Sequence, residues 1–153
     1  MKSLVVYYSE TGNTEKVARA IAKGLNSELK RIDEATMDDI RDSDLICIGT
    51  PVHGSAPAEK VKKFLDEFPI MFEKKGAAFC TLHLFGAKRT FKIIKEKFKN
   101  KGISFIDGFS CRGLSRLVGN FGPRIFNKNR PNEEDLKKAE NFGRKILEIA
   151  EKQ

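Results

Sequence analysis

The chain has 153 residues, of which 40% are hydrophobic and 33% are charged, and its formal net charge is +8. A chain of this length fits one domain that buries roughly 70% of its unfolded surface. No apolar run approaches the roughly 18 residues of a membrane-spanning helix, and the first residues lead directly into a predicted strand. We therefore expect a single domain over residues 1–153, located in the cytoplasm and without a membrane span.

The N-terminal part of the chain predicts a strand, a helix and a second strand. Residues 2–8 are short, β-branched and aromatic, as in a fully buried strand. Apolar residues at helical spacing predict a helix over 13–25, with Gly24 and Asn26 as its stop. A short strand with alternating character is expected at 28–32.

The middle of the chain contains its clearest strand. After a weak helical turn at 33–40, residues 44–50 form an almost uninterrupted apolar run. Such a run is typical of a central strand in a parallel sheet, because both of its faces are covered. A helix is then predicted to begin at Pro57, since proline is favoured in a first turn, and to end at Pro69.

The C-terminal part continues the alternation. A strand is predicted at 76–82, a lysine-rich helix at 88–99 and a fifth strand at 103–111. Residues 112–131 are predicted to be irregular and basic, and they exceed the roughly 2–6 residues usual for such a connection. Asn132, followed by three acidic residues, predicts the start of the last helix.

The order of these elements predicts an α/β fold. Strands that alternate with helices form a parallel sheet with helices on both faces and right-handed crossovers. Five strands with a ligand turn after the first fit the order 2-1-3-4-5, and ligands of such sheets bind at the carboxyl ends of the strands.

The turn after the first strand is rich in short polar residues. Backbone N–H groups and hydroxyls at the positive end of a helix dipole form an anion site. The turn lacks the lysine of a Walker loop and the spaced glycines of a dinucleotide loop, so it favours a phosphate monoester. A helix cap alone would explain one such residue but not the whole run. The candidate phosphate ligands are Ser9, Glu10, Thr11, Gly12, Asn13 and Thr14.

The motif S-x-T-G-N-T at residues 9–14 resembles the phosphate loop of flavodoxins, which bind FMN. The resemblance extends over residues 4–149 and implies a flavodoxin-like three-layer sandwich. The turn that resembles the second flavin loop, which covers one face of the isoalloxazine ring, consists of Thr50, Pro51, Val52, His53 and Gly54. The turn that resembles the third loop, which brackets the ring from the other face, consists of His83, Leu84, Phe85 and Gly86.

Within these loops the analogy assigns some roles. Gly54 would let the backbone approach flavin N5, because glycine tolerates both signs of φ. Flavodoxins usually flank the ring with Trp or Tyr, but this chain has no Trp, and its Tyr residues are at 7 and 8. Aromatic stacking on the flavin ring is therefore limited to His53 or Phe85. The alternative for His53 is an ordinary polar loop position, and the alternative for Phe85 is packing in the core.

The three cysteines, Cys47, Cys80 and Cys111, lie in or at the end of apolar runs. We interpret them as buried small hydrophobic side chains. They are too dispersed for a zinc site, and none begins a Cys-x5-Arg phosphatase loop. No metal site is expected.

Flavodoxins are typically acidic, whereas this chain is basic. Part of the excess belongs to residues 112–131, and part belongs to the predicted helix, at Lys88, Arg89, Lys92, Lys95, Lys97, Lys99 and Lys101. We interpret these two basic segments as a docking surface for the acidic face of a redox partner protein, whose approach would be steered by long-range attraction. A merely solvated surface is the alternative.

The resemblance implies an FMN-binding protein that carries electrons between redox partners, with no catalytic residue. The first alternative is an FMN-dependent NAD(P)H:quinone-type reductase in which residues 112–131 form part of the substrate pocket. The second is a flavin-free basic module that binds nucleic acid. This last function is disfavoured because the chain has no interleaved exposed aromatics and no recognised RNA or DNA motif.

Overall fold

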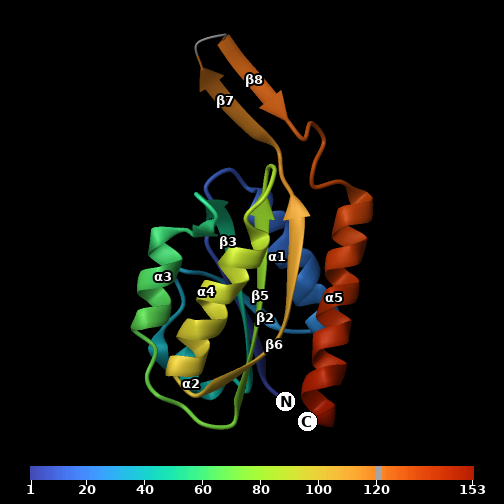
Figure 1. Ribbon diagram of the computed structural model, residues 1–153. Coiled ribbons are helices and arrows are strands. Elements are labelled where there is room, and N and C mark those ends of the chain that lie inside the picture. The colour runs from blue at the N-terminus through green and yellow to red at the C-terminus, as the bar shows by residue number, and fades with distance from the viewer. Residues whose placement is uncertain (120–121) are drawn as a thin grey trace.

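The computed structural model describes residues 1–119 and 122–153, and for residues 115–126 it leaves the side chains undescribed. A sheet of five parallel strands runs through the molecule between two layers of helices (Figure 1). The strand order is β2-β1-β3-β5-β6, which is the predicted order 2-1-3-4-5. The strands are β1 (Ser3–Tyr7), β2 (Glu28–Arg31), β3 (Leu45–His53), β5 (Lys74–Leu82) and β6 (Ile103–Arg112).

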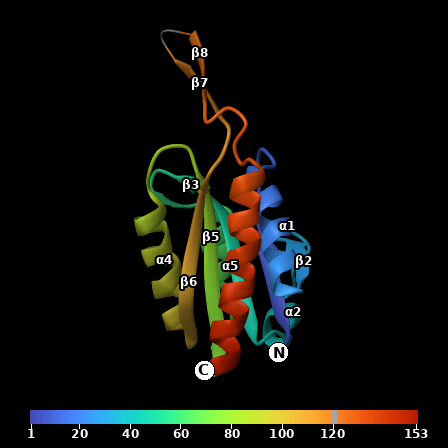
Figure 2. The same ribbon diagram turned by 90° about the vertical axis from the view of Figure 1, so that its right-hand side faces the viewer.

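Helices cover both faces of the sheet, as predicted. Helices α1 (Asn13–Leu25) and α5 (Glu133–Lys152) pack on one face, and α3 (Glu59–Asp66) and α4 (Ala87–Asn100) pack on the other (Figure 2). The short α2 (Met37–Asp42) contributes Ile40 to the second layer. In the part of the chain that the structure describes, no helix is both long and apolar enough to span a bilayer.

The apolar run of β3 is buried on both sides, as its composition predicts. Leu45 and Cys47 belong to the core beneath α1 and α5, whereas Ile46 and Ile48 belong to the core beneath α3 and α4. Next to them, Gly49 lies under the ring of Phe79, and a Cβ at this glycine would lie 2.0 Å from Cζ of that ring.

The predicted start of the third helix at Pro57 is wrong. Pro57 belongs to β4 (Ala56–Pro57), a short strand that pairs antiparallel with the end of β3. The connecting residues Gly54 and Ser55 both have positive φ, 55° and 61°, as a two-residue hairpin turn requires. The chain therefore doubles back before the helix begins at Glu59, and this helix ends at Asp66, before Pro69.

The prediction that residues 112–131 are irregular is also wrong in part. The segment contains an antiparallel hairpin of β7 (Ser115–Gly119) and β8 (Gly122–Phe126). The hairpin extends beyond the sheet at the end where the carboxyl ends of β5 and β6 lie (Figures 1 and 2). Gly119, Gly122 and Pro123 interrupt the alternation by which a strand is recognised in a sequence.

Candidate functional site

A cavity of about 580 Å³ lies at the carboxyl ends of the central strands. Its volume falls within the roughly 300–1,000 Å³ of small-molecule and cofactor sites. All three loops that the sequence singles out contribute to its wall. The lining residues are Glu10, Thr11, Asn13, Thr14, Pro51, Val52, His53, Thr81, Leu82, His83, Gly113 and Leu114.

The predicted phosphate turn leads into α1 without a capping side chain. Gly12 is the N-cap residue with φ of 89°, and no side chain accepts a hydrogen bond from the first turn. The Gly12 N–H itself donates to Ser9 Oγ at 3.1 Å. By contrast, α2 and α5 both begin with complete capping boxes. Because the first N–H groups of a helix have no partner within it, the start of α1 can hold an anion.

Asn13 and Thr14 of this turn form hydrogen bonds with residues far along the chain. Thr14 is buried, and its hydroxyl lies 2.7 Å from the Thr81 hydroxyl of β5. Asn13 Nδ2 donates to the Leu114 carbonyl at 2.8 Å. A hydroxyl can donate and accept at once, so Thr14 keeps capacity for a ligand, whereas one donor of Asn13 is engaged. Ser9 and Gly12 shape the turn and are not among the lining residues.

The predicted turn at residues 50–54, the second loop, is mostly strand in the structure, because β3 continues to His53. Its residues Pro51, Val52 and His53 contribute to the wall. Thr50 instead holds the loop in place, because its buried hydroxyl donates to the Pro51 carbonyl at 2.8 Å and accepts from the Ala58 N–H at 2.9 Å. His53 Nε2 lies 2.6 Å from Glu10 Oε1, so a polar contact joins the second loop to the phosphate turn.

Of the third loop, only His83 lines the cavity. Leu84 and Phe85 are 51% and 75% exposed, so core packing, the alternative we considered for Phe85, is wrong. Gly86 is the N-cap residue of α4 with φ of 111°. A Cβ there would lie 2.8 Å from both Ser55 Cα and Val52 Cγ1, so glycine allows the second and third loops to pack closely.

Four lining residues were not predicted from the sequence. Thr81 and Leu82 stand at the carboxyl end of β5, where the predicted topology could have located them. Gly113 and Leu114 follow β6 in the segment predicted to be irregular.

Residues 4–121 match the sequence model of the flavodoxin domain. The chain belongs to the flavodoxin family. An uncharacterised protein of Methanocaldococcus jannaschii is 36% identical over 96% of this chain and 99% of that protein. The NAD(P)H dehydrogenase (quinone) of Geobacter sulfurreducens is 24% identical over 99% of this chain and 98% of that protein. A solved flavodoxin from the domain Archaea has the same fold, with a TM-score of 0.75 at 23% identity over 99% of both chains.

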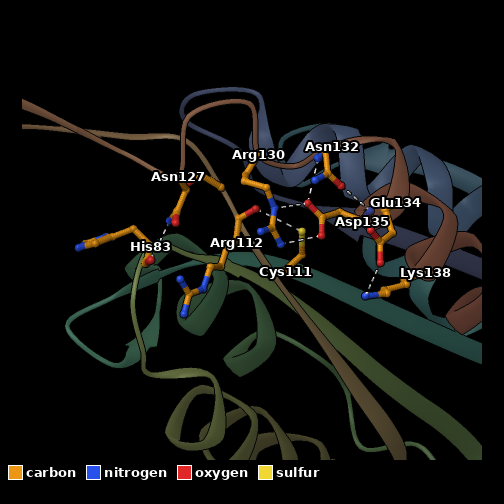
Figure 3. Close-up of polar contacts among 10 residues, drawn as sticks. His83, Cys111, Arg112, Asn127, Arg130, Asn132, Glu134, Asp135 and Lys138 are labelled. Atoms are coloured by element: carbon orange, nitrogen blue, oxygen red, sulfur yellow. Dashed lines mark hydrogen bonds and ion pairs between the residues drawn. The ribbon is translucent and has the colours of Figure 1, made fainter.

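In this member of the flavodoxin family, the base of the hairpin is tied to the cavity wall. Asn127 Nδ2 donates to the His83 carbonyl at 2.7 Å and lies 3.2 Å from the Gly113 carbonyl (Figure 3). The Leu114 N–H donates to the Arg130 carbonyl at 2.8 Å. The cavity wall formed by residues 113–114 is therefore fixed to the third loop and to the second leg of the hairpin.

Arg130 in turn is paired with the start of α5. Its guanidinium donates to both carboxylate oxygens of Asp135, with Nη2 to Oδ1 at 2.7 Å (Figure 3). The same carboxylate accepts from the Asn132 N–H at 2.9 Å. Burial favours a raised pKa for Asp135, but the hydrogen bonds from Arg130 and Asn132 outweigh it and hold the pKa below its ordinary value.

The cysteines are buried and free, as predicted. Burial raises the pKa of Cys80 to about 12 and that of Cys111 to about 11. Burial also raises the pKa of Cys47. The thiols are therefore protonated at neutral pH and unreactive as nucleophiles. Among the described residues, no three His, Cys, Asp or Glu side chains gather in a group that could hold a metal ion.

Proposed function

We propose that this chain binds FMN and carries electrons between redox partner proteins. The observation that carries the proposal is the convergence of the turn after β1, the last residues of β3 and the residues at the end of β5 on one cavity of about 580 Å³. Membership of the flavodoxin family indicates FMN as the cofactor. FMN supplies the redox chemistry, while the protein binds it, orients it and limits its contact with water.

The residues at the start of α1 fit a phosphate group. The first turn of the helix has no side-chain cap, and Thr11, Asn13 and Thr14 line the cavity beside it. A phosphate next to a helix N-terminus gains roughly 0.3–1 kcal/mol from the dipole and more from N–H and hydroxyl donors. The hydrogen bond between the Gly12 N–H and Ser9 Oγ stabilises the shape of this turn.

The residues that would hold the flavin ring are mostly apolar. They come from the second and third loops and from the segment after β6: Pro51, Val52, His53, Leu82, His83 and Leu114. His53 is the aromatic lining residue in the second loop and His83 that in the third. We propose that imidazole and aliphatic side chains take the place of the Trp or Tyr that flavodoxins usually present to the ring.

Titration of the purified protein with FMN and with riboflavin tests both ends of this site. Riboflavin lacks the phosphate, so we expect it to bind at least about tenfold more weakly, since charge-assisted hydrogen bonds contribute about 1.5–3 kcal/mol each. Equal affinities would contradict the assignment of residues 9–14. A colourless protein that fails to bind added FMN would overturn the redox proposal and favour the flavin-free basic module.

The redox partner is proposed to present an acidic face. The net charge of +8 and the lysine-rich α4 support this choice, because oppositely charged surfaces accelerate encounter. The rate of electron transfer to such a partner should fall as salt is raised, since screening shortens the reach of surface charges. A rate that does not change with ionic strength would exclude the electrostatic docking.

A reductase is the second candidate function. It is favoured by the cavity wall at Gly113 and Leu114, which brings the hairpin segment to the site, and by the similarity to an NAD(P)H dehydrogenase (quinone). Steady oxidation of NAD(P)H by the purified FMN-loaded protein with a soluble quinone would support the reductase. A pure carrier should show no turnover without a separate reductase.

A further inference from the structure

Between residues 88 and 95, α4 carries four exposed cations that form no ion pair with any side chain the structure describes. Ion pairs occur elsewhere in the molecule, and on α4 itself Lys97 Nζ lies 2.6 Å from Asp66 Oδ1. Among the residues whose side chains the structure describes, 1–114 and 127–153, no ion pair or side-chain hydrogen bond engages the four, which are Lys88, Arg89, Lys92 and Lys95.

Two of these cations, Lys88 and Arg89, lie in the first turn of the helix, where positive charge is least favourable. The first turn of α4 contains no acidic residue, whereas α1, α2, α3 and α5 each have at least one. The N-terminus of a helix is its positive end, so Lys88 and Arg89 are repelled by the dipole. Helix stability therefore does not account for these two residues, and the dipole strengthens the positive potential that they create.

The four cations surround a groove of about 680 Å³ with apolar side chains in it. Phe91 and Phe105 are half-buried there, and Ser55 and Gly86 form the end nearest the second and third loops. From residue 88 to residue 95 the helix rises about 10 Å, at 1.5 Å per residue. A row of charges of this length matches several carboxylates on an extended segment better than one small anion. We call this surface the α4 groove.

The α4 groove adjoins the candidate flavin site. Gly86 belongs to the groove and packs directly against Val52, which lines the cavity. Leu84 and Phe85, both exposed, precede Gly86 and connect it to His83 of the cavity wall. A partner seated in the groove therefore contacts the loops that are proposed to hold the ring.

We propose that the α4 groove docks a partner protein through an acidic segment that carries an apolar side chain. The apolar side chain packs on Phe91 and Phe105, and the flanking carboxylates pair with the four cations. The identity of the partner as a redox protein rests on the electron-transfer function proposed above. The docking itself can be measured without electron transfer.

The test uses the isotope-labelled, FMN-loaded protein and three probes. One is a synthetic peptide in which Glu residues flank a Phe, another has Gln at every Glu position, and the last is a single-stranded DNA of similar charge. We expect saturable amide shifts at Ser55, Gly86 and the first half of α4 with the acidic peptide only, abolished at high salt. Shifts that cluster elsewhere, or a groove that binds the DNA and not the peptide, would overturn the proposal.

Charge-reversal variants separate docking from general attraction. Lys92→Glu with Lys95→Glu should weaken the acidic peptide about tenfold, since two attractions become repulsions. The neutral variant Lys92→Gln with Lys95→Gln should lose an intermediate amount of affinity for the acidic peptide. It keeps the test valid if the charge-reversal variant misfolds. Lys137→Glu with Lys152→Glu changes the net charge equally on α5, on the opposite face, and should weaken binding less than twofold. Equal losses in both pairs would exclude the groove as the binding surface.

The visible absorption of bound FMN, recorded for each variant, distinguishes the two levels of the proposal. If FMN binds but the peptide causes no localised shifts, docking fails and the cofactor assignment stands. If no FMN binds, the proposed function fails, and the peptide titration of the same protein still decides whether the α4 groove binds acidic segments.

Discussion

The Thr14 hydroxyl at the start of α1 lies 2.7 Å from the Thr81 hydroxyl at the carboxyl end of β5, and both residues are buried and line the cavity. This hydrogen bond joins the phosphate turn to the centre of the sheet. It fixes the first turn of α1 relative to the wall on which the flavin ring is proposed to lie.

Thr81→Val should destabilise the protein by about 1–3 kcal/mol, because it leaves the buried Thr14 hydroxyl without its partner. FMN affinity should fall as well, since the first turn of α1 loses its attachment to β5. Urea unfolding and FMN titration measure the two effects.

Thr90→Val is the matched control. Thr90 is fully buried on α4, and among the described residues its hydroxyl has no hydrogen-bond partner. Replacing an unpaired buried hydroxyl by a methyl group should leave stability unchanged or raise it by about 1 kcal/mol. Equal destabilisation by both variants would contradict the role given to the Thr14–Thr81 bond.

Asp135→Asn should destabilise the protein by about 1–3 kcal/mol at neutral pH, since the buried carboxylate accepts from Arg130 and from the Asn132 N–H. Folding lowers the pKa of Asp135 below its ordinary value of 3.8. The ionised carboxylate therefore stabilises the folded protein above pH 3.8, and this stabilisation is lost as the pH falls through the lowered pKa of the folded state. The difference between the variant and the wild type in urea unfolding should therefore shrink in strong acid. Glu134→Gln, at an exposed pair with Lys138, should change stability by less than about 0.5 kcal/mol.

Gly86→Ala should cost more stability than Gly12→Ala. Both glycines have positive φ, so each variant carries backbone strain of about 1–2 kcal/mol. A Cβ at residue 12 meets nothing within 4 Å, whereas one at residue 86 would overlap Ser55 and Val52 and displace the second loop. Thermal unfolding compares the two, and Gly86→Ala should also weaken FMN binding. Equal losses of stability would show that the contact between the loops is unimportant.

Asn127→Asp should loosen the hairpin base from the cavity wall. The change keeps the shape of the side chain and its tolerance of positive φ, but replaces the donor to the His83 and Gly113 carbonyls with a carboxylate. We expect a loss of about 1–3 kcal/mol and faster amide hydrogen exchange in the third loop. Asn129→Asp, at an exposed position of the same turn, is the control and should change neither. Unaltered exchange in both variants would exclude the proposed attachment.

Local patterns predicted most of the fold and the first part of the site. The alternating hydrophobic periods of residues 2–111 predicted the five parallel strands, and the polar run at 9–14 predicted an anion site at a helix start. These features depend on residues that are neighbours in the sequence, so spacing and composition are enough to recognise them. For Phe85, core packing stayed open as the alternative to a loop position, because an aromatic residue shortly after a strand has the same local pattern whether it packs inward or faces solvent. The structure shows that Phe85 is exposed.

By itself, then, the sequence determined the α/β alternation and the family resemblance, and it predicted a phosphate site at the start of the first helix. Only the tertiary structure decided the remainder of the wall. Asn13 meets Leu114 across 101 residues of chain, and this contact brings the hairpin base to the cavity. Gly24, predicted to stop α1, lies inside the helix and packs against α5, where a Cβ would lie 2.0 Å from the Glu140 carbonyl oxygen. Such contacts join distant segments, and their energies act only once the chain has folded.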